Sequence, residues 1–73
     1  MALRISVAPD GDNWTVRSPA LDLELSFDRG GHAESAARSL ADRYASAGRP
    51  AEVRVFLRDG SLAGAFTYEA EGA

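Results

Sequence analysis

The only histidine of the chain, His32, stands in the stretch FDRGGHAES, with Asp28 four residues before it and Ser35 three residues after it. These are the side chains of a nucleophilic assembly, in which an imidazole contacts both a hydroxyl and a carboxylate. The same stretch also opens a helical pattern. Asp28 is a good N-cap for the free amides of a first turn, and Gly30-Gly31 let the chain turn into the helix. With no second histidine and no sign of an oxyanion site, we interpret the stretch as a helix entry and expect no catalytic residue.

Other stretches contain residue types found in phosphate and calcium sites. Free amides at the start of a helix favour anions, but the Walker pattern also needs a lysine, and the chain has none. The loop DGDN at residues 10–13 groups oxygen ligands, yet a calcium loop needs a further oxygen ligand near position 14, where Trp14 stands. The lack of cysteine excludes thiolate metal sites and disulfides. We expect no metal, no cofactor and no small-molecule substrate.

Length and composition limit the kind of protein further. A chain of 73 residues, 45% of them hydrophobic, is expected to form a single domain over residues 1–73. A domain of this size buries only roughly 60% of its unfolded surface, enough for a thin core but not for a deep substrate cavity. We therefore expect a protein that is not an enzyme. No apolar run approaches the roughly 18 residues of a membrane span, so we expect a cytoplasmic protein without membrane attachment.

Alternating apolar and polar residues predict three strands in the first part of the chain. They cover residues 3–7 (LRISV), 14–17 (WTVR) and 21–27 (LDLELSF). Between the last two, residues 19–20 (Pro-Ala) are expected to form a two-residue turn. This turn sets Trp14 opposite Leu25, and Val16 opposite Leu23. In that register the apolar side chains of both strands share one face.

After residue 30 the apolar period changes from 2 to 3.6, which predicts one amphipathic helix. Its apolar stripe consists of Ala33, Ala37, Leu40, Tyr44 and Ala47, widened by Ala36 and Ala41. An i, i+4 ladder of alternating charge lies on the other side and consists of Glu34, Arg38 and Asp42. Gly48 suits a left-handed C-terminal cap and Pro50 blocks continuation, so the helix is expected to end near Ala47.

The last part of the chain, AEVRVFLRDGSLAGAFTYEA, is typical of a β-hairpin. The Asp-Gly pair at residues 59–60 favours a type I′ turn, in which both central residues have positive φ. Val55 is then opposite Gly64, and Val53 is opposite Phe66.

Together these elements predict an α+β fold: a small antiparallel sheet with one helix packed on one face, in the order strand–strand–strand–helix–strand–strand. The spatial order third–second–first–fifth–fourth keeps neighbouring strands antiparallel, and the fourth strand beside the first remains an open alternative. The helix is expected to cover a core built around Trp14, Leu23, Leu25, Phe27, Val55 and Phe66. In the register of the last hairpin, Leu57 and Leu62 are the residues nearest the turn.

The other face of the sheet carries the candidate interaction residues. Strand alternation places Phe56 there, with Ala63 directly across from it and Ala65 diagonal, a flat patch of low charge that suits a second chain. Three arginines share this face: Arg4, Arg17 and Arg54. We expect a homodimer or a protein partner bound at this face or at a sheet edge. An incidentally exposed phenylalanine is the alternative.

Nucleic acid is the second kind of partner, because arginines beside an aromatic residue resemble a nucleic-acid platform. Asp22, Glu24 and Glu52 lie on the same face, however, and the net charge of -3 opposes the neutralisation of phosphates. A solvent-exposed face of paired charges explains the same residues. Nucleic-acid binding is therefore disfavoured.

The order of the motifs resembles a known family. APDGDNWTV is followed by FD, by the alanine-rich stretch AARSLA, and by V.V..RDG......Y. This order is similar to that of domain of unknown function 2188, a group of small prokaryotic proteins. The matching positions are Trp14, Val16, Phe27, Ala37, Ala41, Val55, Asp59, Gly60 and Tyr68. The chain departs from the family at the helix start, where DRGG replaces a threonine cap. The resemblance implies the fold and a prokaryotic origin, and it carries over no catalytic or ligand residue.

Overall fold

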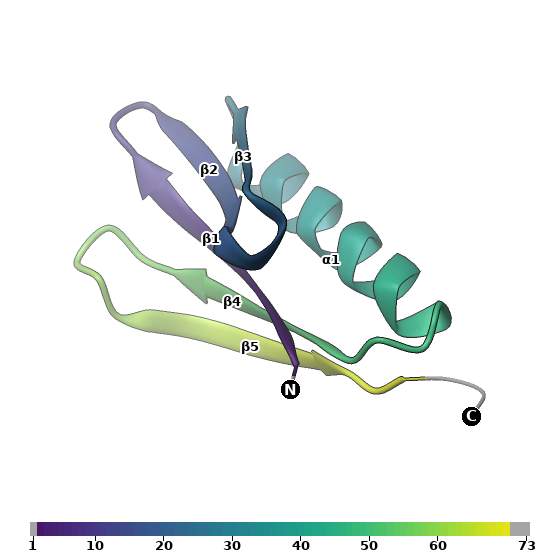
Figure 1. Cartoon of the computed structure of the whole chain (residues 1–73). Helices are drawn as coiled ribbons and strands as arrows, with labels where there is room; N and C mark the ends of the chain where they lie inside the picture. The colour runs from purple at the N-terminus through teal and green to yellow at the C-terminus, as the bar shows by residue number, and fades with distance from the viewer. Residues whose placement is uncertain (1, 71–73) are drawn as a thin grey trace.

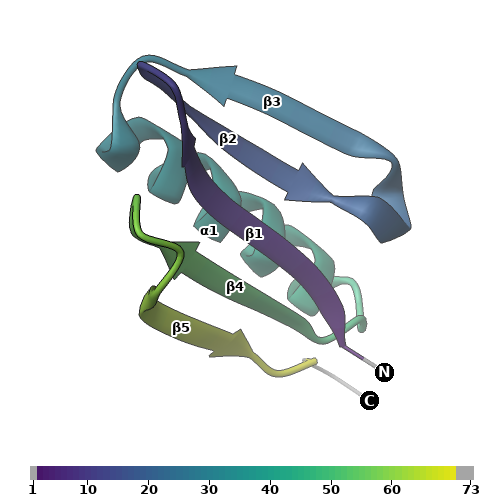
Figure 2. The ribbon, with the colours of Figure 1, turned by 90° about the vertical axis from the view of Figure 1, so that its left-hand side faces the viewer.

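One helix packs on one face of a five-stranded sheet in the computed structural model, which describes residues 2–70 (Figures 1 and 2). The elements are β1 (Leu3–Asp10), β2 (Asn13–Ser18), the 3-10 helix η1 (Pro19–Leu21), β3 (Leu23–Phe27), α1 (Gly30–Ser46), β4 (Ala51–Phe56) and β5 (Leu62–Tyr68). The spatial order of the strands is β3-β2-β1-β4-β5. The predicted α+β class and the order of elements along the chain are confirmed.

The sheet is mixed, because β1 and β4 run parallel while the other neighbouring strands are antiparallel. The favoured spatial order, with β5 between β1 and β4, is therefore wrong, and the alternative that places β4 beside β1 is correct. Burial explains the choice. β4 buries Ala51 and Val53 completely, whereas every residue of β5 is at least partly exposed, so β4 takes the inner position and β5 the edge.

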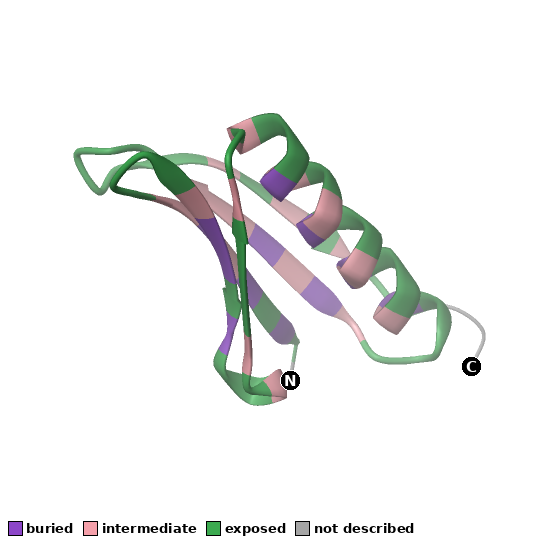
Figure 3. Ribbon diagram, turned by 90° about the horizontal axis from the view of Figure 1, so that it is seen from above, coloured by how far each residue is buried: buried purple, intermediate pink, exposed green. Residues whose placement is uncertain are grey.

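The core lies between α1 and the central strands. The helix contributes only alanines to its fully buried part: Ala33, Ala37, Ala41 and Ala45. The strands contribute Leu3, Ile5, Val7, Val16, Ala51 and Val53. Because alanine side chains are short, the helix backbone lies close to the sheet, and the larger aliphatic side chains of the strands fill the space. Figure 3 shows the buried side of α1 facing the buried stretches of the strands.

The margin of the core differs from the prediction. Trp14, Leu23, Phe27, Val55 and Phe66 are only partly buried, and three leucines are exposed: Leu25 at 42%, Leu57 at 49% and Leu62 at 52%. The expected core position of Leu25 is therefore wrong. The three leucines lie on the edge strand β3 and at the outer end of the last hairpin, where a single helix leaves the sheet uncovered. At the end of α1, Ala47 was expected in the apolar stripe but is the exposed C-cap residue. Ala45, which was not in the predicted stripe, is buried instead.

The connection between β2 and β3 is longer than the expected two-residue turn. Pro19–Leu21 form the 3-10 helix, and Asp22 closes it with a φ of 52° and an amide hydrogen bond of 3.1 Å to the Pro19 carbonyl. Trp14 is consequently paired with Phe27, and Val16 with Leu25. The predicted register is wrong by two residues. Because a shift of two keeps every side chain on the same face, the predicted faces still hold.

The start of α1 shows why a glycine stands there. Arg29 is the N-cap and its side chain forms no capping hydrogen bond, so the predicted capping role of Asp28 is wrong. A Cβ atom on Gly30 would lie 2.8 Å from Cε2 of Trp14, whereas one on Gly31 would have no neighbour within 4 Å. Gly30 is therefore required by the close approach of the indole ring, and Gly31 is not. Neither glycine has positive φ, so the turn does not depend on left-handed backbone.

The end of α1 follows the prediction. Gly48 has a φ of 96°. Its amide donates to the Ala45 carbonyl at 3.0 Å, and the Arg49 amide donates to the Tyr44 carbonyl at 2.9 Å. This pair of hydrogen bonds is the Schellman motif, which uses a left-handed glycine to satisfy the last carbonyls of a helix. The chain then enters β4 through Pro50.

The β4–β5 hairpin has the predicted register in its middle, with Val53 opposite Phe66 and Val55 opposite Gly64. Its end differs. The loop spans residues 58–60, and the Gly60 amide donates to the Leu57 carbonyl at 2.9 Å. Positive φ occurs at Gly60 (88°) but not at the preceding residue, so the type I′ turn is wrong. A turn ending in a left-handed glycine takes its place and is accompanied by a register shift between Val55 and Phe56.

Candidate functional site

The residues of the possible nucleophilic assembly do not share a pocket. Asp28, His32 and Ser35 are all exposed at the start of α1. Ser35 lines a shallow groove along the helix, and neither His32 nor Asp28 contributes to it. The stretch forms the entry to the helix, and the geometry of its side chains offers no base positioned against a nucleophile.

The acidic loop at residues 10–13 is a β-hairpin turn. Gly11 adopts a φ of 61° there, and Asp10 accepts a long hydrogen bond of 3.5 Å from the Thr15 hydroxyl. Within residues 2–70, no three His, Cys, Asp or Glu side chains are grouped so that they could hold a metal ion. Over the same residues, no helix combines the length and hydropathy needed to cross a bilayer.

The arginines of the outer sheet face are paired with carboxylates. Glu52 Oε1 accepts from Arg54 Nε at 3.0 Å and lies 3.4 Å from Arg4 Nε. On the neighbouring strands, Arg17 Nη2 donates to Glu24 Oε2 at 3.1 Å. Arg4, Arg17 and Glu24 are exposed, Arg54 and Glu52 are half-buried, and pairs at the protein surface contribute about 0–1 kcal/mol each. The structure thus brings Arg4 and Arg54 together around one carboxylate and leaves Arg17 in a separate pair.

Phe56 has neighbours other than those predicted. It is half-buried, and the register shift pairs it with Leu62, so the expected pairing with Ala63 is wrong. The side chain of Arg58 crosses from the hairpin loop and donates to the Gly11 carbonyl at 2.8 Å, which ties this loop to the β1–β2 turn. The apolar surface at this end consists of Leu57 and Leu62 more than of Phe56. Sequence alternation missed it because a bulge interrupts the period.

A short polar network shapes the hairpin loop. Asp59 Oδ1 accepts a hydrogen bond of 2.6 Å from the Ser61 hydroxyl and one of 2.9 Å from the Ser61 amide. These hydrogen bonds favour the ionised carboxylate and lower the pKa of Asp59 below its ordinary value. The loop is therefore held most firmly when Asp59 is charged.

β3 and β5 form the two edges of the sheet (Figure 2). The two strands differ in length and charge. β3 at one edge has five residues, includes Glu24, and is flanked by Asp22 and Asp28. β5 at the other edge has seven residues, LAGAFTY, with no charged residue and no proline. Ala63 and Ala65, two of the predicted interaction residues, are exposed on this strand. β5 therefore lacks the charges, prolines and short length that usually prevent an edge strand from pairing with another chain.

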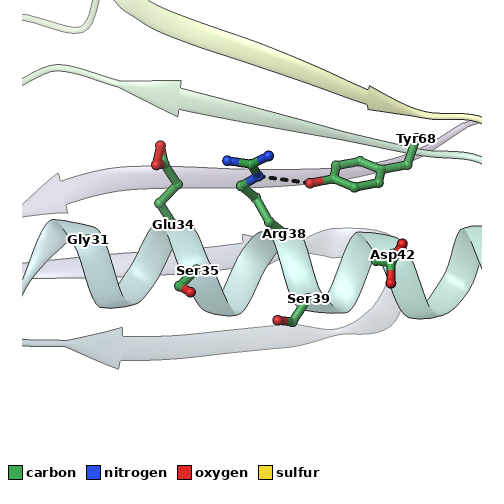
Figure 4. Close-up of a pocket in the computed structure, with 7 residues that line it drawn as sticks. All are labelled: Gly31, Glu34, Ser35, Arg38, Ser39, Asp42 and Tyr68. Carbon is green, nitrogen blue, oxygen red and sulfur yellow. Dashed lines mark hydrogen bonds between the residues drawn. The ribbon is translucent and has the colours of Figure 1, made fainter.

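Arg38 lies against two aromatic residues of β5, Phe66 and Tyr68; Figure 4 shows Arg38 and Tyr68. Arg38 Nε donates to the Tyr68 hydroxyl at 2.9 Å, and its guanidinium carbon lies 4.5 Å from the centre of the Phe66 ring. The hydrogen bond to Tyr68 raises the pKa of Arg38, which is charged at all relevant pH values in any case. In the part of the chain that the structure describes, Arg38 forms no ion pair with Glu34 or Asp42, so the expected ladder is not formed.

This cluster borders a groove of about 420 Å³ that runs along α1. Its lining is mostly polar and consists of Gly31, Glu34, Ser35, Arg38, Ser39, Asp42 and Tyr68. Figure 4 shows that Arg38 points toward Tyr68, while Ser35 and Ser39 lie on another side of the helix. The groove is open and its lining is mostly polar, whereas sites that enclose a small ligand are concave and mostly apolar.

No family model, curated protein or solved structure matches the chain at a significant level. The resemblance to domain of unknown function 2188 therefore stays a prediction.

Proposed function

We propose that the protein is a non-enzymatic binding module that accepts an additional β-strand at the edge formed by β5. The observation that carries this proposal is the character of that edge: seven residues without a charge or a proline, beyond which no element lies among residues 2–70. An unpaired edge presents backbone donors and acceptors in a row, and an extended chain can hydrogen-bond to them.

The side chains around β5 add to the affinity that backbone pairing supplies. On the helix side, half-buried Phe66 and Tyr68 offer apolar surface at alternate positions, as strand-addition sites do for the side chains of an incoming chain. At the end of the hairpin, Leu57 and Leu62 are exposed and add further apolar surface. An incoming strand thus gains main-chain hydrogen bonds and apolar contacts at the same edge.

Preorganisation also favours binding at this edge. Arg38 lies over the Phe66 ring and donates to the Tyr68 hydroxyl, and these two contacts favour one arrangement of the three side chains before binding. Side chains that are ordered before binding lower the entropic cost of association. We further propose a cytoplasmic location and a prokaryotic origin, on the basis of composition and the family resemblance.

A peptide that copies residues 62–68, with a charged tail for solubility, tests strand addition. Titrated into isotope-labelled protein, it is expected to shift the backbone amide resonances of β5 and to leave those of β3 unchanged. The control is the same peptide with proline in place of Ala65, which cannot maintain the ladder. Equal shifts with both peptides, shifts confined to other strands, or no shifts at millimolar peptide would refute the proposal.

A further inference from the structure

We infer that the strand added at β5 is the β5 strand of a second copy of this chain, paired antiparallel about a two-fold axis at Ala65. This inference rests on the proposed strand addition and names its partner. The pairing joins two sheets into one continuous sheet, and the two copies contribute the same surface, as in an isologous dimer.

The length of β5 selects the position of the axis. Ala65 is the middle residue of Leu62–Tyr68, so an axis there pairs the whole strand. Ala65 meets Ala65 of the second copy, Gly64 meets its Phe66, and Ala63 meets its Thr67. An axis at Gly64 or at Phe66 leaves two residues at one end of each strand without a partner. The axis at Ala65 therefore forms the longest ladder available.

The side chains are complementary in this register on both faces. On the helix side, each Phe66 lies opposite a glycine of the other copy, and a glycine leaves room for an aromatic ring on its neighbour. On the outer face, the paired residues are alanine with alanine and alanine with threonine, which are small and uncharged. At each end of the ladder Leu62 lies opposite Tyr68 of the other copy, the one pair of two bulky side chains, and no pair brings two charged groups together.

Charge explains why a second copy fits this edge and not the other. Pairing two copies of β3 would bring together the carboxylates of Asp22, Glu24 and Asp28 from both chains. Like charges opposite one another destabilise a strand pair. The uncharged β5 carries no such penalty against itself. A single seven-residue ladder is smaller than a standard interface, so we expect dissociation at about micromolar concentration or weaker.

Charge variants at Ala65 test the partner and the axis together. Ala65 is exposed and opposite Arg54 within the chain, so Ala65→Glu and Ala65→Lys are expected to fold, which circular dichroism checks. In sedimentation over a hundredfold range of concentration, the wild type is expected to dimerise and each variant to remain monomeric. An equimolar mixture of both variants should recover the dimer, because opposite charges then face one another. Ser26→Lys on β3 is the matched control and should dimerise like the wild type.

Cysteine cross-linking locates the axis independently, because the chain has no cysteine of its own. Directly opposed residues of antiparallel strands have Cα atoms about 4.5–5.5 Å apart, within the range that a disulfide spans. With oxidised glutathione as the oxidant, Ala65→Cys should form a covalent dimer. Ala63→Cys should form one only when it is mixed with Thr67→Cys.

The outcomes separate the inference from the proposal on which it rests. A wild type that stays monomeric over the whole range overturns the second copy as partner, while the peptide titration alone decides strand addition. A wild type that dimerises, with no cross-link at Ala65→Cys and no effect of the charge variants, overturns the axis at Ala65.

Discussion

Two adjacent glycines at the start of α1 should respond in opposite directions to the same substitution. Gly31→Ala meets open space at a helical position without positive φ. It should stabilise the protein by about 0.5 kcal/mol, because alanine loses less backbone entropy on folding than glycine. Gly30→Ala gains the same entropic term but places its Cβ 2.8 Å from Cε2 and 3.0 Å from Cζ2 of Trp14.

The structure sets the size of the clash at Gly30. Carbon atoms prefer a separation of about 3.5–4.0 Å, so the indole or the first helical turn must move by roughly 1 Å. Overpacking of this kind typically costs about 1–3 kcal/mol. After the entropic gain, Gly30→Ala should destabilise the protein by about 0.5–2.5 kcal/mol, and the two variants should differ by the cost of the clash, about 1–3 kcal/mol.

Urea unfolding followed by tryptophan fluorescence measures both variants, because Trp14 is the only tryptophan. The emission of folded Gly30→Ala should also change, since the displaced ring is the fluorophore. In the Trp14→Phe background, where the ring is smaller, Gly30→Ala should lose most of its penalty, with unfolding then followed by circular dichroism. Equal stabilisation by Gly30→Ala and Gly31→Ala would refute the close approach of Trp14 to the helix.

Three further variants test the core, the helix entry and the hairpin loop. Trp14→Ala should lower the free energy of unfolding by about 2–3 kcal/mol. This is at or below the lower limit of the loss expected for a fully buried tryptophan, because the Trp14 side chain is only partly buried. An unchanged urea midpoint would contradict this prediction. His32→Ala should change the stability by less than about 0.5 kcal/mol, since the residue is exposed, and a large drop in melting temperature would show a structural role. The pKa of Asp59 is lower in the folded protein than in the unfolded chain. The ionised carboxylate therefore stabilises the fold above about pH 4, and this stabilisation is lost as the pH falls through the pKa of the folded state. Ser61→Ala, which removes the strongest of its hydrogen-bond donors, should weaken this acid dependence in thermal unfolding, and an unchanged pH profile would show that the loop network does not stabilise the fold.

Much of the local structure could be predicted because it depends on neighbours in sequence. The alternation in LDLELSF indicates a strand, and the periodic alanines with Gly48 indicate a helix and its end, since period and cap chemistry are local. The middle of the last hairpin follows from strands joined by a short loop. The loop itself was harder, because a bulge at residues 62–63 changes the pairing of Phe56 without a clear signal in composition.

The candidate site was predicted only in part. Ala63 and Ala65 are exposed, but the importance of β5 depends on its place at the edge, which alternation cannot show. Arg38 and Tyr68 are 30 residues apart in the chain. They meet only because α1 packs against the side of the sheet that contains β4 and β5. The period of 2 places Tyr68 on the helix side with Phe66, and a cation on the facing helix is the signal in the sequence that points to this contact.

The sequence by itself determined which segments form strands and helix, which face of each segment is apolar, and which residue types are available for chemistry. Only the tertiary structure decided that β4 lies beside β1, that Leu25 is left partly in solvent, and that Trp14 lies against Gly30. The physical reason is that periodicity encodes the orientation of a side chain relative to its own backbone. The depth of burial and the identity of an edge depend instead on which strands become neighbours, and this follows from the packing of all the elements on one helix.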